Sequence, residues 1–413
     1  MASFQLATLV LAVFLLYRKF SVVNAGCTIP MANLNDTSPL ILLHSPRKGD
    51  SPFYMPKNPA SGSLSFRSGQ SVRFACPDAD NNLLLIPKST FRVYDVIAQC
   101  RKGSEFSINS LPYDFYSLRC IRPPQPKIKE EGSCDIGQGK KYNIGFNLKR
   151  KFFGLIEICY DTRNQSALNA RYILSKTVPS LEENKILARV DHTTTPTDVY
   201  SCKSQAKYVA GILGSQNQVK QFIKCDYGRL QYLAKHHLVP ASDFLFEYQK
   251  KATSYYINTV PQWESISSGN WRILEDRIRV FANKQKSDLT IVSGTLDVTS
   301  LPDVKGVERK LYLNRDKKGN VIVPVPALFW KLVLNHNKNS GIVFIGVNNP
   351  YHRDLFRLGF IICTNICGNT VSWFSGWNRM DLSQGFIYCC AVNDFKLKAG
   401  IYPFPYSAKY LLS

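Results

Sequence analysis

Acidic residues are scarce in this sequence of 413 residues: 30 Asp and Glu stand against 52 Lys and Arg, which gives a formal net charge of +22. An excess of one sign on this scale stores electrostatic self-repulsion in the folded chain. Because a polyanion relieves that repulsion, the charge favours nucleic acid, an anionic membrane surface or a sulfated glycan as partner. The alternative is a basic surface that serves only solubility.

Long apolar runs are also missing from the sequence after its N-terminal segment. No later stretch approaches the 18 apolar residues that a transmembrane helix requires. Repeats and low-complexity tracts are absent as well, which excludes solenoid arrays and collagen-like chains. Hydrophobic residues make up 45% of the sequence, so we expect a folded globular chain long enough for two domains.

The N-terminal segment is typical of a secretory signal peptide. Residues 6–17 form an apolar run, and Val23 and Ala25 place small side chains before a cleavage point at Gly26. We therefore predict that residues 1–25 are removed and that the mature protein is secreted and leaves the membrane. The first residues lack Lys and Arg, and a basic pair follows the run, so an uncleaved signal anchor is the alternative.

The cysteine count agrees with secretion. Twelve cysteines are present, and an even number in an oxidising compartment predicts disulfides, although the sequence does not give their connectivity. Cys363 and Cys367, followed by the adjacent Cys389 and Cys390, could instead form a zinc site. Zinc ribbons prefer two short Cys-x2-Cys pairs, which this spacing does not match. Two glycosylation sequons begin at Asn35 and at Asn164.

Short alternating runs broken by Gly, Pro and Ser predict a small β-rich, disulfide-stapled module over residues 26–137. A polar, proline-rich stretch at residues 122–132 is the predicted linker. Residues 138–413 then form the second domain. The expected strands are residues 63–74 (two strands with a turn), 92–97, 113–121, 152–160, 167–174, 252–260, 289–292, 321–325 and 342–347. The expected helices are residues 204–213 and the amphipathic segment 270–284.

Residues 235–279 combine groups that suit phosphodiester hydrolysis. His237 precedes a strand that carries amide side chains, and Glu275 and Arg279 follow one turn apart on the predicted helix. A neutral imidazole can accept the proton of an attacking water. Oxygen ligands hold Mg2+, and a guanidinium neutralises phosphate charge. On a surface reading, Glu275 and Arg279 would form only an i, i+4 ion pair.

This segment resembles the active site of the DNA/RNA non-specific endonuclease family, the ββα-metal nucleases, and within it the secreted insect branch. The family pattern is Asp-Arg-Gly-His-x-x-Pro/Ala, then Asn-x-x-Pro-Gln, then Asn-x-Gly-x-Trp with Glu four residues later. The resemblance spans about residues 140–395. It implies an α+β fold with a central sheet, flanking helices and a ββα site motif. It also implies a Mg2+ cofactor. The matching positions are His237 as general base, Asn258 and Gln262 as supporting amides, Trp271 in the helix register, Glu275 anchoring metal-bound waters, and Arg279 on phosphate.

The sequence departs from the family pattern at three places. Lys235 replaces arginine in the candidate catalytic set; it keeps the charge and loses the bidentate fork. His236 replaces a glycine and adds bulk. Ser267 replaces the metal-binding asparagine, and a hydroxyl is a weaker Mg2+ ligand than an amide oxygen. Asn270 lies close by as a supporting amide, and we expect it to point elsewhere.

The altered site and the positive charge together predict a secreted protein that binds DNA and RNA without sequence specificity and cleaves them weakly with Mg2+. Two alternatives stay open: a fully active secreted endonuclease, and a structural or receptor-binding protein that has abandoned nucleic acid. The basic run Lys149, Arg150 and Lys151 is a further candidate for nucleic-acid contacts. If metal binding is the main defect, Ser267→Asn should raise nuclease activity.

Overall fold

The computed structural model describes residues 26–46, 51–57, 61–78, 80–85, 89–149, 151–178, 199–225, 231–352, 355, 359–368 and 371–412. The predicted signal peptide, residues 1–25, lies outside these ranges. Within them, no helix has the length and apolar character needed to cross a membrane. The chain divides into two compact units, Met1–Pro124 and Gln125–Ser413.

The first unit is built from short antiparallel strands. Its five-stranded sheet has the order β2-β4-β7-β8-β9, and β1 pairs with β3 while β5 lies between β10 and β6. The strands are β1 (Cys27–Pro30), β2 (Leu40–Leu43), β3 (Ser63–Phe66), β4 (Ser71–Ala75), β5 (Leu83–Leu85), β6 (Ser89–Val93), β7 (Asp95–Lys102), β8 (Glu105–Ile108), β9 (Leu111–Asp114) and β10 (Leu118–Cys120). Disulfides join Cys27 to Cys100 and Cys76 to Cys120. These bridges support a small aromatic core in which the Phe106 ring meets the Phe74 ring edge-on at 5.1 Å. The predicted β-rich disulfide module is therefore present.

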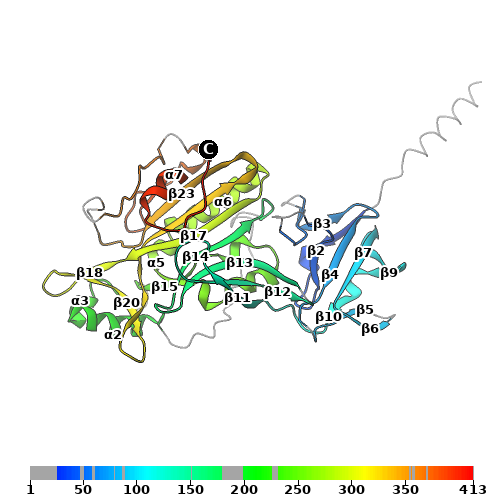
Figure 1. Ribbon diagram of the computed structural model, residues 1–413, viewed down its shortest axis with the longest axis horizontal. Coiled ribbons are helices and arrows are strands. Elements are labelled where there is room, and N and C mark those ends of the chain that lie inside the picture. Colours follow the sequence, from blue (N-terminus) through cyan, green and yellow to red (C-terminus); the bar gives the residue numbers. More distant parts are fainter. Residues whose placement is uncertain are drawn as a thin grey trace, which may run out of the picture. The chain divides into compact units, whose positions relative to one another are not determined.

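A nine-stranded sheet organises the second unit (Figure 1). Its order is β11-β12-β13-β14-β17-β22-β23-β24, and β25 adds to β23 as the parallel strand. The strands are β11 (Lys127–Ser133), β12 (Lys140–Leu148), β13 (Lys151–Asp161), β14 (Ser166–Leu174), β17 (Leu289–Val298), β22 (Pro326–Asn335), β23 (Ser340–Val347), β24 (Ile387–Cys390) and β25 (Tyr410–Leu411). Short connections join β11 to β12, β12 to β13, β13 to β14 and β22 to β23, as antiparallel neighbours allow, whereas longer segments separate the other pairs.

Helices and two-stranded hairpins surround this sheet. The helices are α2 (Cys202–Leu213), α3 (Gln216–Val219), α4 (Glu247–Thr253), α5 (Glu264–Ser267), α6 (Asn270–Gln285) and α7 (Val392–Lys398). The hairpins pair β15 (Leu233–His237) with β16 (Thr259–Trp263), β18 (Ser300–Pro302) with β19 (Glu308–Lys310), and β20 (Tyr312–Arg315) with β21 (Val321–Pro324). The α+β class predicted for this domain is confirmed.

The strands β22 and β23 separate two hydrophobic cores, and every residue of both strands is buried. Successive side chains alternate between the faces. Phe329 and Val333 therefore join the core under α6 and the β15–β16 hairpin, whereas Trp330 and Leu332 join the core under α7. Lys331 shares the face of Phe329 and Val333, so a cationic side chain points towards α6.

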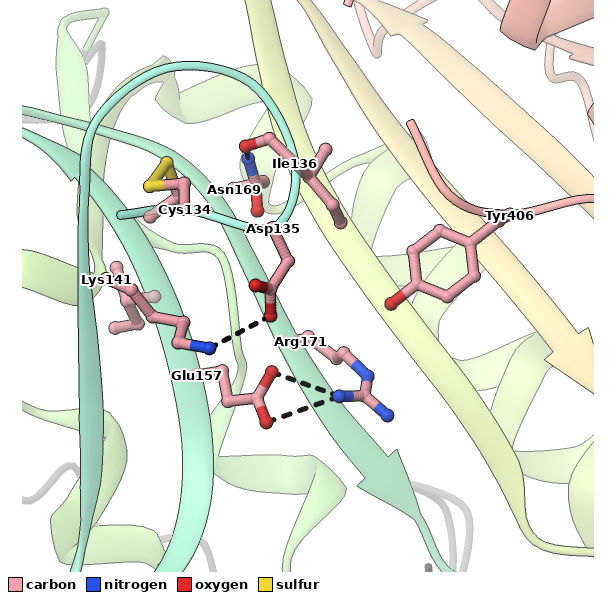
Figure 2. Close-up of a pocket in the computed structure, with 10 residues that line it drawn as sticks. Cys134, Asp135, Ile136, Lys141, Glu157, Asn169, Arg171 and Tyr406 are labelled. Atoms are coloured by element: carbon pink, nitrogen blue, oxygen red, sulfur yellow. Dashed lines mark hydrogen bonds and ion pairs between the residues drawn. A yellow bond between two sulfur atoms is a disulfide. The ribbon is translucent and has the colours of Figure 1, made fainter. Parts of the chain in front are cut away.

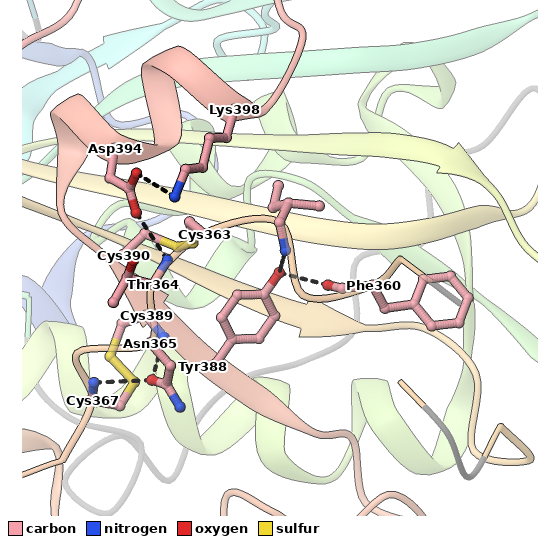
Figure 3. Close-up of a disulfide and its surroundings, with 11 residues drawn as sticks. Phe360, Cys363, Thr364, Asn365, Cys367, Tyr388, Cys389, Cys390, Asp394 and Lys398 are labelled. Carbon is pink, nitrogen blue, oxygen red and sulfur yellow. Dashed lines mark hydrogen bonds and ion pairs between the residues drawn. A yellow bond between two sulfur atoms is a disulfide. The ribbon is translucent and has the colours of Figure 1, made fainter. Parts of the chain in front are cut away.

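All twelve cysteines form disulfides, which excludes the zinc alternative. The four candidate zinc ligands pair as Cys363–Cys390 and Cys367–Cys389 and tie a long loop to β24 (Figure 3). The Tyr388 hydroxyl donates to the Phe360 carbonyl at 2.6 Å and anchors the same loop. In the second unit, further bridges are Cys134–Cys159 and Cys202–Cys225.

Two expectations about local structure were wrong. Residues 252–260, predicted to be a strand because of their β-branched and aromatic content, form the end of α4, a 3-10 turn at Tyr256–Asn258, and only the first residues of β16. Tertiary contacts override β-propensity here. The predicted linker, residues 122–132, contains most of β11, which pairs with β12 at the sheet edge. The two compact units divide at Pro124, and the domain boundary expected at residue 137 stays a prediction.

Candidate active site

The β15–β16 hairpin carries the histidines of the candidate site. Its register pairs His236 with Val260 and His237 with Thr259. Because side chains alternate along a strand, Lys235 and His237 share one face, where both are half-buried, and His236 occupies the other face, where it is 7% exposed. The expected general base and its neighbour therefore face opposite sides of the hairpin.

Asn258 fixes the turn that follows His237. Its side-chain oxygen accepts from the Val239 amide at 3.0 Å, and its amide donates to the carbonyls of Val239 and Thr253 at 3.0 and 2.7 Å. The side chain is fully buried. Asn258 therefore satisfies backbone groups that would otherwise be buried without partners, which gives it a role in positioning the backbone beside His237.

The helix α6 packs Trp271 against the sheet and against the inner face of the hairpin. The Trp271 ring lies 6.3 Å from the His236 ring and 5.7 Å from the Phe329 ring, centre to centre. A β-carbon at Gly346 would lie 2.8 Å from the Trp271 ring, so only glycine allows this approach. The position is tight enough to fix α6 relative to β23.

Asn270 begins α6 and points away from the hairpin, as expected. Its amide donates to the carbonyls of Asn378 and Gly385 at 3.0 and 2.7 Å. These bonds tie the start of the helix to the loop before β24. Asn270 is therefore engaged as a structural amide and does not replace Ser267.

Ser267 and His236 contact each other. The His236 Nδ1 atom lies 3.2 Å from the Ser267 hydroxyl oxygen. Burial, together with the charge of Lys331, lowers the pKa of His236 well below its usual value, so the ring is neutral at pH 7. Two of the three residues that depart from the family motif thus contact each other beside Trp271, and His236 is the buried member of the pair.

Glu275 forms a buried ion pair with Lys331. The Lys331 Nζ atom lies 3.1 Å from a Glu275 carboxylate oxygen, and the two side chains are 1% and 8% exposed. Burial raises the pKa of Glu275, and the charge of Lys331 opposes that rise. The Lys331 ammonium also lies 5.7 Å from the centre of the Trp271 ring. This cation holds Glu275 in place and compensates its negative charge.

Arg279 lies one turn further along α6 in a second buried ion pair. It contacts the Asp243 carboxylate at 2.6 Å and the Ser242 hydroxyl at 3.0 Å. Tyr172 donates a hydrogen bond to the same Asp243 carboxylate. Burial alone would lower the pKa of Arg279, but Asp243 and Glu275 raise it overall, so the guanidinium stays charged. Arg279 is only 1% exposed. Its contacts with Asp243 and Ser242 stabilise the loop after β15.

Gln262 lies on the inner face of the hairpin, diagonal to His236 in the register. It is fully buried. Neither atom of its amide group has a hydrogen-bond partner within the described part of the chain, and the same holds for the His236 Nε2 atom. Buried polar atoms normally have hydrogen-bond partners. These unpartnered groups therefore make the interior beside Ser267 and His236 polar.

The donor set around Ser267 does not fit a resident Mg2+ ion. Mg2+ requires near-octahedral oxygen ligands and usually one or two carboxylates. Here the Ser267 hydroxyl contacts an imidazole, and the Glu275 carboxylate contacts an ammonium group. Among the described residues, no group of three or more His, Cys, Asp and Glu could hold a metal. An imidazole nitrogen also suits transition metals better than Mg2+.

The basic run predicted to contact nucleic acid lies apart from this cluster. Lys149 and Lys151 flank the turn between β12 and β13 and are exposed, and Arg150 lies outside the described residues. Lys151 packs its ammonium over the Phe153 ring at 5.0 Å. The structure therefore does not bring Lys149 and Lys151 into the buried network around Glu275.

A small pocket elsewhere in this unit is lined by charged side chains that form ion pairs with one another. It lies over β12, β13 and β14 beside the Cys134–Cys159 bridge (Figure 2). Lys141 contacts Asp135 at 3.0 Å, and Arg171 contacts both carboxylate oxygens of Glu157 at 3.0 and 3.2 Å. Its cations are thus already paired, and none of the predicted site residues lines it.

Sequence reasoning missed two members of the buried network, Lys331 and Asp243. Lys331 interrupts a run of apolar residues in β22, and a lone charge in such a run requires a buried partner. That signal indicated an ion pair but could not name Glu275, which lies 56 residues earlier. The bulk that His236 adds in place of the motif glycine lies within β15 and faces inward.

Salivary proteins from several species are similar to this chain. The salivary endonuclease of Lutzomyia longipalpis is 28% identical over 356 residues, which cover 82% of this chain and 75% of that protein. Salivary protein Tsal1 of Glossina morsitans morsitans is 24% identical over 387 residues, 91% of each chain. The salivary endonuclease of Culex quinquefasciatus is 25% identical over 413 residues, 96% of each chain. The predicted relationship to the insect branch of the family, with the tsetse-fly Tsal proteins among the relatives, is confirmed.

A family model for DNA/RNA non-specific endonucleases matches residues 137–395. This match covers more than half of the chain and includes the β15–β16 hairpin, α6 and the strand that carries Lys331. The chain therefore belongs to the DNA/RNA non-specific endonuclease family.

Proposed function

We propose that this protein is secreted, binds DNA and RNA without sequence specificity, and retains at most weak Mg2+-dependent phosphodiester cleavage. Secretion is supported by the six disulfides and by relatives named salivary proteins. The net charge of +22 supports binding to a polyanion. Membership of the DNA/RNA non-specific endonuclease family favours nucleic acid over the other polyanions.

The proposal of weak cleavage rests on one observation: both candidate metal residues, Ser267 and Glu275, already contact another side chain. The half-buried Ser267 contacts the buried His236, and Glu275 contacts Lys331 in a pair with almost no solvent exposure. Admitting a metal ion there would require separating both contacts and leaving a buried lysine without its carboxylate. Leaving one member of a buried pair uncompensated costs about 3–5 kcal/mol.

Two measurements on the purified protein test this proposal. The first is cleavage of plasmid DNA and duplex RNA with Mg2+ and with EDTA. The second is a mobility-shift titration in EDTA at several salt concentrations. We expect slow cleavage, and tight binding whose affinity falls steeply as salt rises because counterions are released from the phosphates.

A fully active secreted endonuclease is the second candidate. It is favoured by the two relatives named salivary endonuclease and by the half-buried His237, which shares a face with Lys235. Rapid Mg2+-dependent turnover that His237→Ala abolishes would establish this candidate and refute weak cleavage. His236→Ala is the matched comparison, because it removes an imidazole from the other face of the same strand.

The third candidate is a protein that has abandoned nucleic acid. Its distinguishing result is the absence of a mobility shift in EDTA at low salt for both DNA and RNA. That result would overturn the proposed binding function irrespective of the cleavage assay.

A further inference from the structure

One part of the second unit, next to the β15–β16 hairpin, is rich in Lys and Arg. It consists of residues 202–225, which form α2 and α3, and residues 300–324, which form the β18–β19 and β20–β21 hairpins; we call it the basic lobe. It contains ten Lys and Arg and three Asp and Glu. Figure 1 shows its elements gathered on one side of the unit.

The lobe is one connected piece of structure. The helix α2 packs against β20. The Gln218 side chain donates to the Pro302 carbonyl at 2.8 Å, and the Val304 amide donates to the Leu213 carbonyl at 3.3 Å. The Cys202–Cys225 disulfide closes the helical part. The cations of α2, α3 and the hairpins are consequently held on a common support.

The three acidic side chains of the lobe are used to shape its turns. Asp303 accepts from the amides of Lys305 and Val307 at 2.8 and 3.0 Å and pairs with Arg309 at 2.9 Å. Asp316 accepts from the amides of Lys318 and Asn320, both at 2.8 Å. Glu308 accepts from the Ser300 hydroxyl.

The remaining cations of the lobe have no carboxylate partner among the described residues. Arg309 makes the lobe's ion pair within the described ranges, whereas most of the other ion pairs there engage cations of the first unit, the sheet and α6. The unpaired set is Lys203, Lys207, Lys220, Lys224, Lys305, Lys310, Arg315, Lys317 and Lys318. All of these are exposed except Lys224, which is half-buried.

The lobe is joined directly to the strand that carries Lys235 and His237. The Gln205 side chain of α2 donates to the Leu233 carbonyl at 2.7 Å and accepts from the Leu233 amide at 2.9 Å. Leu233 is the first residue of β15. These buried hydrogen bonds anchor the lobe to the hairpin of the candidate site.

We propose that the basic lobe is a second, metal-independent surface that binds the phosphate backbone of nucleic acid. Its cations contact phosphates and carry no base specificity, because backbone contacts position a nucleic acid without reading its sequence. Asp303 and Asp316 already hold the turns at Lys305 and at Lys317–Lys318 in shape, so little conformational freedom is lost when a strand binds. This inference rests on the proposed nucleic-acid binding and assigns it to particular residues.

The test compares two triple variants that remove the same charge. The lobe variant is Lys305→Gln, Lys317→Gln and Lys318→Gln, all on exposed turns. The control variant is Lys396→Gln, Lys398→Gln and Lys409→Gln, at exposed positions of α7 and the C-terminal segment. Dissociation constants for a short DNA duplex are measured in EDTA over a range of salt concentrations, after thermal unfolding confirms that both variants fold.

Each lysine that contacts a phosphate contributes about 1 to the slope of log affinity against log salt. We therefore expect the slope of the lobe variant to fall by roughly 2–3, with little change for the control variant. If the parent binds and the two variants lose the same slope, binding follows net charge and the lobe assignment is wrong. If neither variant loses any slope, other residues contact the phosphates and the assignment is equally wrong.

Two further outcomes are separable. A parent protein that binds neither this duplex nor RNA in EDTA overturns the proposed binding function itself, before the variants are compared. A lobe variant that keeps duplex binding but loses binding to heparin assigns the lobe to a sulfated glycan and overturns the nucleic-acid inference alone.

Discussion

The contact between His236 and Ser267 makes a strong prediction about restoring metal-dependent cleavage. Ser267→Asn supplies the amide oxygen that the family motif has, but the new side chain must enter a space that the His236 imidazole already fills. We therefore expect Ser267→Asn alone to change cleavage by less than about threefold. The double variant His236→Gly/Ser267→Asn opens the space and is expected to raise cleavage at least tenfold, which corresponds to about 1.4 kcal/mol.

The expected coupling can be worked from the structure. The His236 ring is 7% exposed, and its Nδ1 atom contacts the Ser267 hydroxyl at 3.2 Å. Removing one partner leaves the other buried without its hydrogen bond, at a cost of about 1–3 kcal/mol. Residues in direct contact show coupling energies of about 0.5–3 kcal/mol in double-mutant cycles. Ser267→Asn alone should consequently lower the free energy of unfolding, and His236→Gly should recover part of that loss.

The assay is the initial rate of plasmid relaxation at several Mg2+ concentrations for the parent, both single variants and the double variant. Chemical denaturation of the same four proteins gives the coupling in stability. His236→Gly alone is the necessary control, because it leaves a cavity beside Trp271 and Phe329. Equal gains from Ser267→Asn alone and from the double variant would show that His236 does not block the site, and the reasoning would be refuted.

Three further predictions concern the buried network and the bridges. Lys331→Met should lower the free energy of unfolding by about 3–5 kcal/mol because Glu275 is left buried without its cation, and Lys331→Met combined with Glu275→Leu should recover much of that loss in the same denaturation assay. Because the pKa of His236 is lowered in the folded state, the unfolded chain binds an extra proton below about pH 6.5. Stability should therefore be full above that pH and fall by up to about 1.4 kcal/mol per pH unit below it; a His236→Gln variant with the same acid slope would contradict this. Thermal unfolding should be insensitive to chelators and sensitive to reductants, since the four candidate zinc ligands form disulfides.

The sequence alone predicted much of the architecture of the second unit. The amphipathic spacing of Trp271, Leu274 and Ile278 predicted α6, because a helix repeats its buried face every three to four residues. The strands β13, β14 and β23 were predicted from apolar runs, and the even cysteine count predicted disulfides. These features are local or compositional, so they can be recognised in the sequence without knowledge of the fold. The prediction of a strand at residues 252–260 was wrong because β-propensity favours a strand only where neighbouring strands and a buried face are available for packing.

Tertiary structure alone decided what the candidate site residues contact. The sequence aligned His237, Ser267 and Glu275 with a motif, and it identified Ser267 as the damaged position. It could not show that His236 turns inward to meet Ser267, since that depends on the strand register and on how α6 packs. It also could not show that Glu275 meets Lys331, 56 residues away in the chain. Burial makes these contacts strong, and only the folded chain creates the burial.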